Sequence, residues 1–140
     1  MSANGVPGVA DDVGSVPVAC RRFPATPAAA AGARGWAGVQ LATFGLPDVV
    51  LDDVALVLGE LVSNVVTHTH VRTFLVSLRV DQSVTVIVED DERAVPSVRT
   101  AVDGDVSGRG LRIVEALTLA WGVTTTREGK AVWARLRRAA

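Results

Sequence analysis

The most constraining feature of the sequence is a long apolar run with helical spacing that follows Asp48. Its apolar residues recur three and four positions apart, as on one face of an α-helix: Val50, Leu51, Val54, Ala55, Leu58, Leu61, Val62 and Val65. The apolar surface continues nearly all round the helix through Leu56, Val57 and Val66. A helix of this kind is buried on most sides. The sequence therefore predicts a central helix, capped by Asp48, that other elements surround.

A hairpin is expected directly after this helix. Apolar residues alternate along 73–80 and again along 83–89, and Asp81-Gln82 between them fits a tight turn. The other expected elements are an edge strand over 16–23, a helix over 26–44 with a Thr26 cap and Pro27 in its first turn, a helix over 110–119, and closing strands over 121–126 and 131–136. Strands outnumber helices and pair mostly as hairpins, which predicts an α+β two-layer sandwich with helices on one face of the sheet.

The stretch from Asp90 to Ser107 loses all periodicity. It mixes acids and arginines with Ser, Thr, Gly and Pro96. So long a segment without regular structure is uncommon inside a compact domain, and such segments are often functional. We therefore expect a lid over a binding site.

Size and composition fit one domain and exclude several classes of protein. The chain has 140 residues, with 49% hydrophobic and 21% charged residues and a net charge of -1. A nucleic-acid-binding protein would be expected to carry a basic face. Cys20 is the only cysteine, which excludes an intrachain disulfide, suits a cytoplasmic protein and fits a packed thiol. No membrane span or signal peptide is expected. Residues 1–14 read as a disordered tail and 15–140 as the folded domain.

Two polar residues stand out on the apolar helix. Glu60 and Asn64 are four positions apart, so both project from one face. A buried carboxylate needs a partner or a function. The structural alternative, an Asn–Glu hydrogen bond in the core, is the better explanation on spacing alone. The pair His68 and His70 reads as polarity at the end of the helix, because no zinc-binding spacing accompanies it.

Two further groups could contact a nucleotide. Asp90 ends a strand, where its carboxylate could accept a hydrogen bond from the amino group of adenine; the alternative is an acid that caps a turn. Asp91 and Glu92 follow it, so the assignment among the three acids depends on the register of the strand. Gly108-Arg109-Gly110-Leu111 leads into a helix. Glycines there allow close approach of the backbone to phosphate, and the N–H groups of a helix N-terminus attract anions. The spacing G-x-G is a weak signal by itself, and the Rossmann and Walker fingerprints are absent.

Together, four segments resemble a known family, the GHKL-type ATPases, in the form of the actinobacterial anti-sigma-factor serine/threonine kinases. ELVSNVVTH at 60–68 resembles the N box, and VIVEDDERAVP at 86–96 the first glycine box. SGRGLRIVEALTLAWGV at 107–123 resembles the second glycine box, and GKAVWARL at 129–136 the closing strand. The similarity covers roughly residues 16–138. It implies a mixed, mostly antiparallel sheet covered by helices, with ATP held between helix and lid.

The resemblance also implies roles for individual residues. Glu60 would be the general base and Asn64 the ligand of Mg²⁺. Asp90 would bind adenine. Gly108 and Gly110, with Arg109 and Leu111 beside them, would bring the lid backbone to the phosphates of ATP. The protein partner would be an antagonist of the STAS type, with a sigma factor as a second partner, and a homodimer is compatible with the family.

The sequence also departs from the family pattern. Glu92 stands where the first glycine box has glycine, Val65 replaces a small alanine, and Ala131 occupies a position often held by threonine. These departures leave a rival interpretation open, a non-catalytic interaction module of the same fold that regulates by binding a partner protein. A detached histidine-kinase catalytic domain is a third, weaker interpretation, because it would need a phosphoacceptor helix elsewhere.

Overall fold

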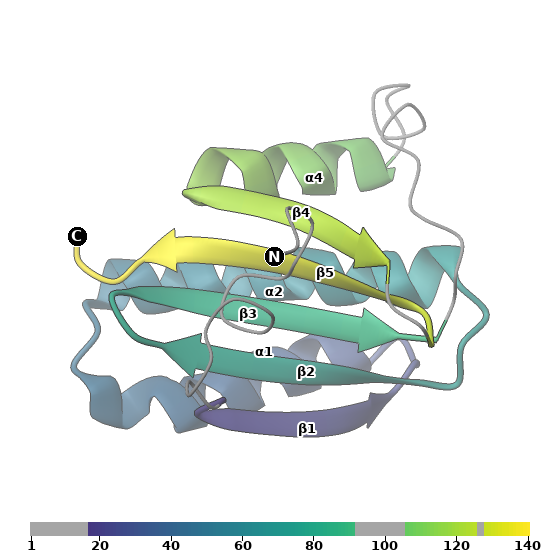
Figure 1. The fold of residues 1–140 in the computed structure, drawn as a ribbon, viewed down its shortest axis with the longest axis horizontal. Coiled ribbons are helices and arrows are strands. Elements are labelled where there is room, and N and C mark those ends of the chain that lie inside the picture. Colours follow the sequence, from purple (N-terminus) through teal and green to yellow (C-terminus); the bar gives the residue numbers. More distant parts are fainter. Residues whose placement is uncertain (1–16, 92–105, 126–127) are drawn as a thin grey trace.

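The computed structural model describes residues 17–91, 106–125 and 128–140, with backbone only over 106–109. Its elements follow the expected order: β1 (Ala19–Pro24), α1 (Ala29–Leu41), the short 3₁₀ helix η1 (Ala42–Phe44), α2 (Asp48–His68), β2 (Thr73–Val80), β3 (Ser83–Asp90), α4 (Val106–Leu117), β4 (Ala120–Thr125) and β5 (Lys130–Arg137). The strands form one five-stranded sheet in the order β1-β2-β3-β5-β4. Figure 1 shows the helices stacked against this sheet.

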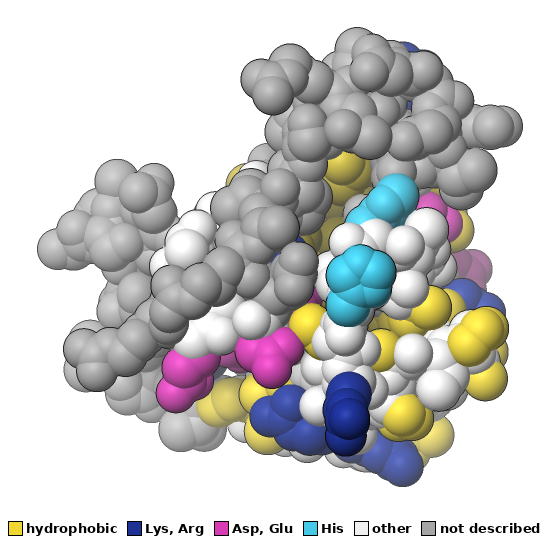
Figure 2. Space-filling model, turned by 90° about the vertical axis from the view of Figure 1, so that its right-hand side faces the viewer, with side chains coloured by type: hydrophobic (Ala, Val, Ile, Leu, Met, Phe, Trp, Pro, Cys, Tyr) yellow, Lys and Arg dark blue, Asp and Glu magenta, His cyan; other side chains and the backbone are white. Residues whose placement is uncertain are grey.

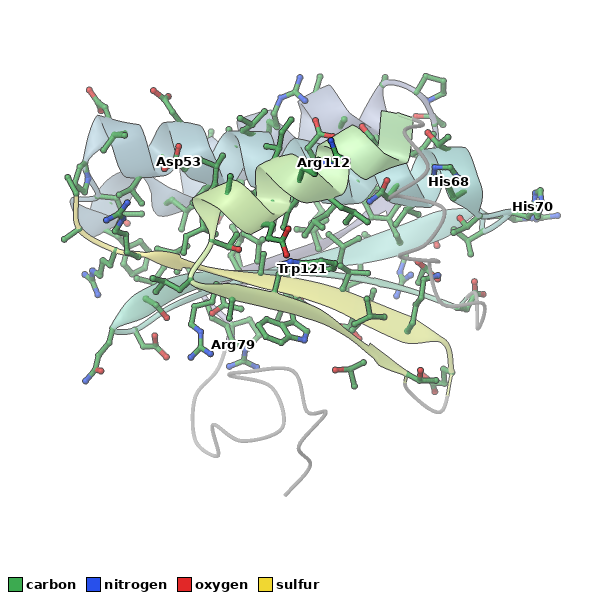
Figure 3. The ribbon with its side chains drawn as sticks, turned by 90° about the horizontal axis from the view of Figure 1, so that it is seen from above. Asp53, His68, His70, Arg79, Arg112 and Trp121 are labelled. Carbon is green, nitrogen blue, oxygen red and sulfur yellow. The ribbon has the colours of Figure 1, made fainter. Side chains whose placement is uncertain are left out.

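The described helices α1, α2 and α4 cover one face of the sheet, and the main core lies between the two layers (Figure 3). Because side chains alternate along a strand, every second residue of β3 and β5 faces the helices. These residues include Val86, Val88 and Ala134, which are fully or almost fully buried in the main core. The opposite face carries a small second cluster of Ile87 and Ala131 with Trp133 packed against it. The predicted α+β two-layer sandwich is confirmed.

Helix α2 is the central helix that the sequence predicts. It packs against α1, α4, β3 and β5, because its buried residues lie on more than one side. The expectation of an apolar surface nearly all round was too broad, since Leu56 is 44% exposed. No helix in the described part of the chain is both long and apolar enough to span a bilayer.

Several local expectations were wrong. The N-cap of α1 is Ala28, with Pro27 outside the helix, and no side chain caps it. Asp48 is the first residue of α2 and does not cap it by a side-chain hydrogen bond. All pairings between the described strands are antiparallel, so the mixed sheet implied by the resemblance is antiparallel throughout these strands. Cys20 is exposed on the edge strand β1 and is not a packed thiol.

The segment between β3 and α4 was only partly predicted. Helix α4 begins at Val106, so the end of the expected irregular stretch is helical. Gly108, expected just before the helix, accordingly lies inside its first turn, and Gly110, the expected first residue, follows in the same helix. The rest of the expected lid and the expected disordered tail at 1–14 lie outside the described residues.

Candidate functional site

The candidate site lies at one end of the molecule, between α2, α4 and the sheet. In Figure 1 the C-terminal end of α2, the N-terminal end of α4, the end of β3 and the start of β5 all lie on the right-hand side. Antiparallel pairing of β3 with β5 places the end of one strand beside the start of the other, with Asp90 opposite Lys130. Segments far apart in the sequence therefore meet at this end.

Helix α2 carries Glu60 and Asn64 on this side of the fold. Both side chains are half-buried, whereas the flanking Leu61, Val62 and Val65 are buried. Within the part of the chain that the structure describes, no hydrogen bond joins Glu60 to Asn64. The structural alternative of an Asn–Glu pair in the core therefore does not account for these two residues.

Helix α4 lies directly against the Glu60 carboxylate through Gly110. A β-carbon built on Gly110 would collide with Glu60 Oε1 and would lie 3.5 Å from Glu60 Cδ. Gly110 is buried at this contact. The absence of a side chain at Gly110 therefore gives the first turns of α4 their close approach to Glu60, and the N-box segment and the second glycine-box segment are in contact.

The end of β3 carries a buried ion pair. Lys130 Nζ donates a hydrogen bond to Asp90 Oδ1 at 3.1 Å, and the two side chains are 2% and 0% exposed. By alternation both residues share the face of Val88 and Val132, the face that the helices cover. Asp90 is thus on the same side of the sheet as Glu60. Lys130 was not predicted as a site residue, although its alternation with Val132 indicates that it shares the helix-covered face.

Gly129 allows β5 to press against the end of β3. A β-carbon on Gly129 would collide with the carbonyl oxygen of Asp90 and would lie 2.5 Å from the Cα of Asp91. Both neighbours are backbone atoms, which cannot swing aside as a side chain can. The close approach fixes the position of the Asp90–Lys130 pair relative to the strand ends.

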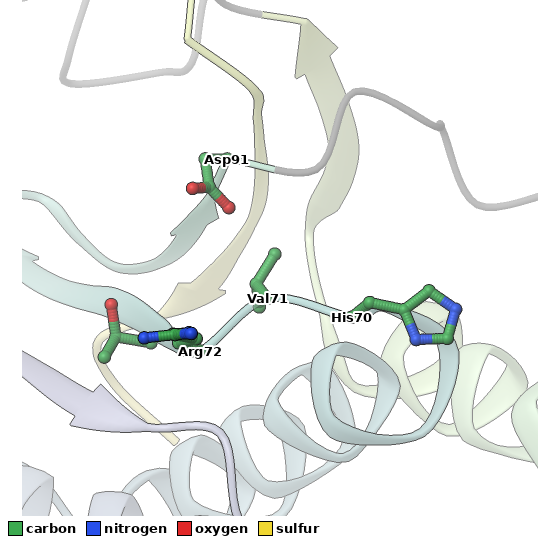
Figure 4. A pocket seen from close by; sticks show the side chains of 5 residues that line it. His70, Val71, Arg72 and Asp91 are labelled. Atoms are coloured by element: carbon green, nitrogen blue, oxygen red, sulfur yellow. The ribbon is translucent and has the colours of Figure 1, made fainter.

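An open pocket lies at the same end of the fold, beside Asp91. It has a volume of about 510 Å³ and is lined by Asp91 and by residues 70–73 of the α2–β2 connection. Figure 4 shows Asp91 at the end of β3 opposite Arg72 and Val71. Figure 2 views the molecule from this end and shows the two histidines and several acidic side chains around it. Asp91 is exposed to this pocket, whereas Asp90 is buried.

The remaining predicted site residues are placed less fully. Leu111 is half-buried on α4, next to Gly110. Gly108 and Arg109 belong to α4, but their side-chain surroundings lie outside the described part. Glu92 also lies outside it. Ala131 faces away from the helices, against Ile87, so a threonine oxygen at this position would not point to the helix-covered side.

Three further polar residues near this end, Glu89, His68 and His70, lie outside the group formed by Glu60, Gly110, Asp90 and Lys130. Glu89 alternates with Asp90 and faces away from the helices. Burial raises the pKa of its carboxyl, Arg22 opposes this by lowering it, and Glu128 adds to the rise.

His68 and His70 are exposed, and the described ranges hold no group of three or more His, Cys, Asp or Glu side chains arranged for a metal.

The donor chemistry fits a magnesium nucleotide. Carboxylate and amide oxygens, as in Glu60 and Asn64, are the ligands of a hard cation such as Mg²⁺. The N-terminal turns of α4, a helix of 12 residues, lie at the same end of the fold as the C-terminal end of α2 (Figure 1), and the N-terminus of a helix favours an anion. Gly110 shows that the helix backbone approaches Glu60 without an intervening side chain.

Comparison with known proteins agrees with this geometry. Over residues 23–136 the chain matches the family model described as the histidine kinase-like ATPase domain. The crystal structure of the RsbU and RsbW domains of Rv1364c from Mycobacterium tuberculosis has a similar fold, with a TM-score of 0.61 and 20% identity over 85% of this chain. The chain spans only 32% of that structure.

A second solved structure is more distant. The histidine kinase domain of the Erythrobacter litoralis EL346 blue-light activated histidine kinase has a TM-score of 0.45 and 23% identity, over 64% of this chain and 45% of that one, which is too distant to support an inference. No curated protein matches the chain. The match to the family model covers most of the sequence, and an ATPase domain implies ATP binding. The chain therefore belongs to the family of histidine kinase-like ATPase domains.

Proposed function

We propose that the protein is an ATP-dependent serine/threonine kinase of the anti-sigma-factor type that phosphorylates an antagonist protein of the STAS type. The observation that carries the proposal is the contact of Gly110 with the Glu60 carboxylate, because it joins the two segments that would hold the phosphates and the attacking hydroxyl. The similarity of fold to a structure with an RsbW domain supports the choice of partner class. A sigma factor would be a second partner.

In this proposal Glu60 acts as the general base. Its carboxylate accepts the proton of a serine or threonine hydroxyl on the partner while the hydroxyl oxygen bonds to the γ-phosphorus of ATP. The bond from that phosphorus to its bridging oxygen breaks, and ADP leaves. Phosphoryl transfer depends mainly on positioning and charge stabilisation, so a half-buried carboxylate held against α4 is a suitable base.

The other residues bind and orient the nucleotide. Asn64 would offer its amide oxygen to Mg²⁺, which neutralises charge on the phosphates when bound. Gly108 and Gly110 would leave the backbone of α4 open to the phosphates, with Arg109 and Leu111 flanking them. Asp90 would accept a hydrogen bond from the amino group of adenine, since its carboxylate lies on the helix-covered side of β3.

The proposal is tested by Glu60→Gln. The variant keeps size and hydrogen bonding but loses basicity, so it should bind Mg·ATP as the wild type does. Its rate of phosphate transfer should fall by about two to four orders of magnitude, the range for a lost general base. The assay follows radiolabelled phosphate from ATP to candidate antagonist proteins encoded near the gene. Transfer by Glu60→Gln at the wild-type rate would exclude Glu60 as the base.

The rival function is a non-catalytic interaction module. Of the two departures from the family pattern that favour it, only Glu92 still counts against nucleotide binding. Glu92 still replaces a glycine of the family pattern. Ala131 no longer argues against nucleotide binding, because it faces away from the helix-covered side, where Lys130 stands beside Asp90. Calorimetry with ATP, with and without Mg²⁺, separates the two functions. A wild-type protein that binds no nucleotide, or that binds it and phosphorylates no antagonist, would favour the module.

A further inference from the structure

The ion pair of Lys130 with Asp90 is unusual for its burial. Lys130 is the only lysine of the chain, yet its side chain is 2% exposed and the carboxylate that it holds is 0% exposed. Burying two charges carries a large desolvation cost for each ion before their attraction is counted, and well-packed apolar residues are often at least as stabilising. A contribution to stability alone is therefore a weak explanation for the presence of a buried ion pair at this position.

A need to hold β3 and β5 together is also a weak explanation for the ion pair. Strands β3 and β5 are already joined over eight register pairs, from Ser83–Arg137 to Asp90–Lys130. The ion pair occupies the last of these, at the end of the fold where the candidate site lies. Gly129 brings the start of β5 against the backbone of Asp90 and so sets where the ammonium stands.

We propose that Lys130 is a positioning residue that makes Asp90 selective for a 6-aminopurine. The proposal rests on the proposed function, in which Asp90 binds the base. With Nζ bound to Oδ1 at 3.1 Å, one oxygen of the carboxylate is anchored and the negative charge is compensated. An ionised carboxylate only accepts hydrogen bonds. A carboxylate held in this way matches a purine that donates from position 6 and disfavours one with an oxygen or only a hydrogen there.

The test compares the affinities of two nucleotides that differ only at position 6. ATP carries the amino group, and purine riboside 5′-triphosphate carries hydrogen. A hydrogen bond to a charged group corresponds to about tenfold to a hundredfold in affinity, so we expect wild type to prefer ATP by that factor with Mg²⁺ present. In Lys130→Met the two nucleotides should bind with affinities within about threefold of each other, and Lys130→Arg should restore part of the preference for ATP.

Arg135→Met is the matched control. Arg135 is a half-buried cation on the same strand, but it faces away from the helices. Its removal should leave the preference for ATP unchanged. A merely structural Lys130 would weaken both nucleotides equally in Lys130→Met and leave their ratio at the wild-type value, which would overturn the inference.

A second measurement needs no variant and so does not depend on the folding of Lys130→Met. Because Lys130 is the only lysine, wild-type protein with ¹³C at the lysine ε-carbon gives one lysine signal by NMR. That signal should move differently with ATP than with purine riboside 5′-triphosphate. An identical movement with both would overturn the role of Lys130 while leaving nucleotide binding intact. Wild type that binds neither nucleotide would overturn the proposed function as well.

Discussion

Gly110→Ala is the sharpest test of how the site is built. The added methyl group would collide with Glu60 Oε1, while Glu60 Cδ and Cβ, at 3.5 and 3.8 Å, are already at ordinary contact distances. Only the carboxylate end must move, and it belongs to a flexible side chain. We therefore expect the substitution to displace the Glu60 carboxylate by about 1 Å and to leave the packing of α4 on α2 intact.

The expected effects on stability and on activity differ in size. Alanine is favoured over glycine inside a helix by about 1 kcal/mol, which offsets the cost of moving the Glu60 side chain. The change in unfolding free energy should therefore stay within about 1 kcal/mol. A misplacement of about 1 Å in a catalytic group can reduce a rate by about a hundredfold. We expect a loss of that order in phosphate transfer.

The assay measures phosphate transfer to the antagonist, the Kd of Mg·ATP by calorimetry and the Tm by circular dichroism. Gly59→Ala is the matched control, because its methyl group would also meet the far end of a flexible side chain, lying 2.8 Å from Arg34 Nη1. Arg34 is exposed and can swing outward. This control should keep both its transfer rate and its Tm.

One result would refute the reasoning. If Gly110→Ala is folded and transfers phosphate as fast as Gly59→Ala, the position of the Glu60 carboxylate against α4 does not matter for the reaction. Equal losses in the two variants would instead indicate a general effect of filling space around α2.

Three further outcomes follow from the structure. Asn64→Ala should weaken Mg·ATP binding far more than binding of metal-free ATP, as measured by calorimetry; equal losses would remove the Mg²⁺ role. Gly129→Ala should lower stability by about 1–3 kcal/mol in urea titration, because its methyl group meets the backbone of Asp90 and Asp91; an unchanged midpoint would contradict that contact. Burial raises the pKa of Glu89, so the folded state binds the proton of this carboxyl more tightly than the unfolded state does. The contribution of Glu89 to the free energy of unfolding therefore falls as the pH rises. Glu89→Gln should therefore raise the Tm at neutral pH and lose this advantage below the ordinary pKa of 4.5, and a Tm difference that does not change with pH would contradict the burial of this carboxyl.

The fold could be predicted where local patterns determine it. The alternation along β2 and β3 and the helical spacing of α2 gave these elements within a residue or two, because burial of one face imposes the period. The start of α4 at Val106 was missed, since the residues before Gly110 show no apolar periodicity. The exposure of Cys20 could not be read either, because it depends on β1 being an edge strand.

The site was predictable in part. Four-residue spacing on α2 was enough to place Glu60 and Asn64 on one face, whereas the assignment among Asp90, Asp91 and Glu92 depended on the register of the strand. Lys130 was missed because its partner is 40 residues away and their meeting depends on how β3 pairs with β5. The contact of Gly110 with Glu60 is likewise a property of helix packing, and no local pattern contains it.

The pairing of β5 with β3 has a consequence for how this domain can change in evolution. The same alternation puts Val132 and Ala134 into the core and Lys130 beside Asp90. A shift of the whole of β5 by one residue against β3 would turn all three to the opposite face at once, and a one-residue insertion or deletion inside β5 would turn those on one side of the change. Length changes in this strand should therefore be tolerated only two residues at a time, so variation in chain length among descendants of this sequence is expected outside β5.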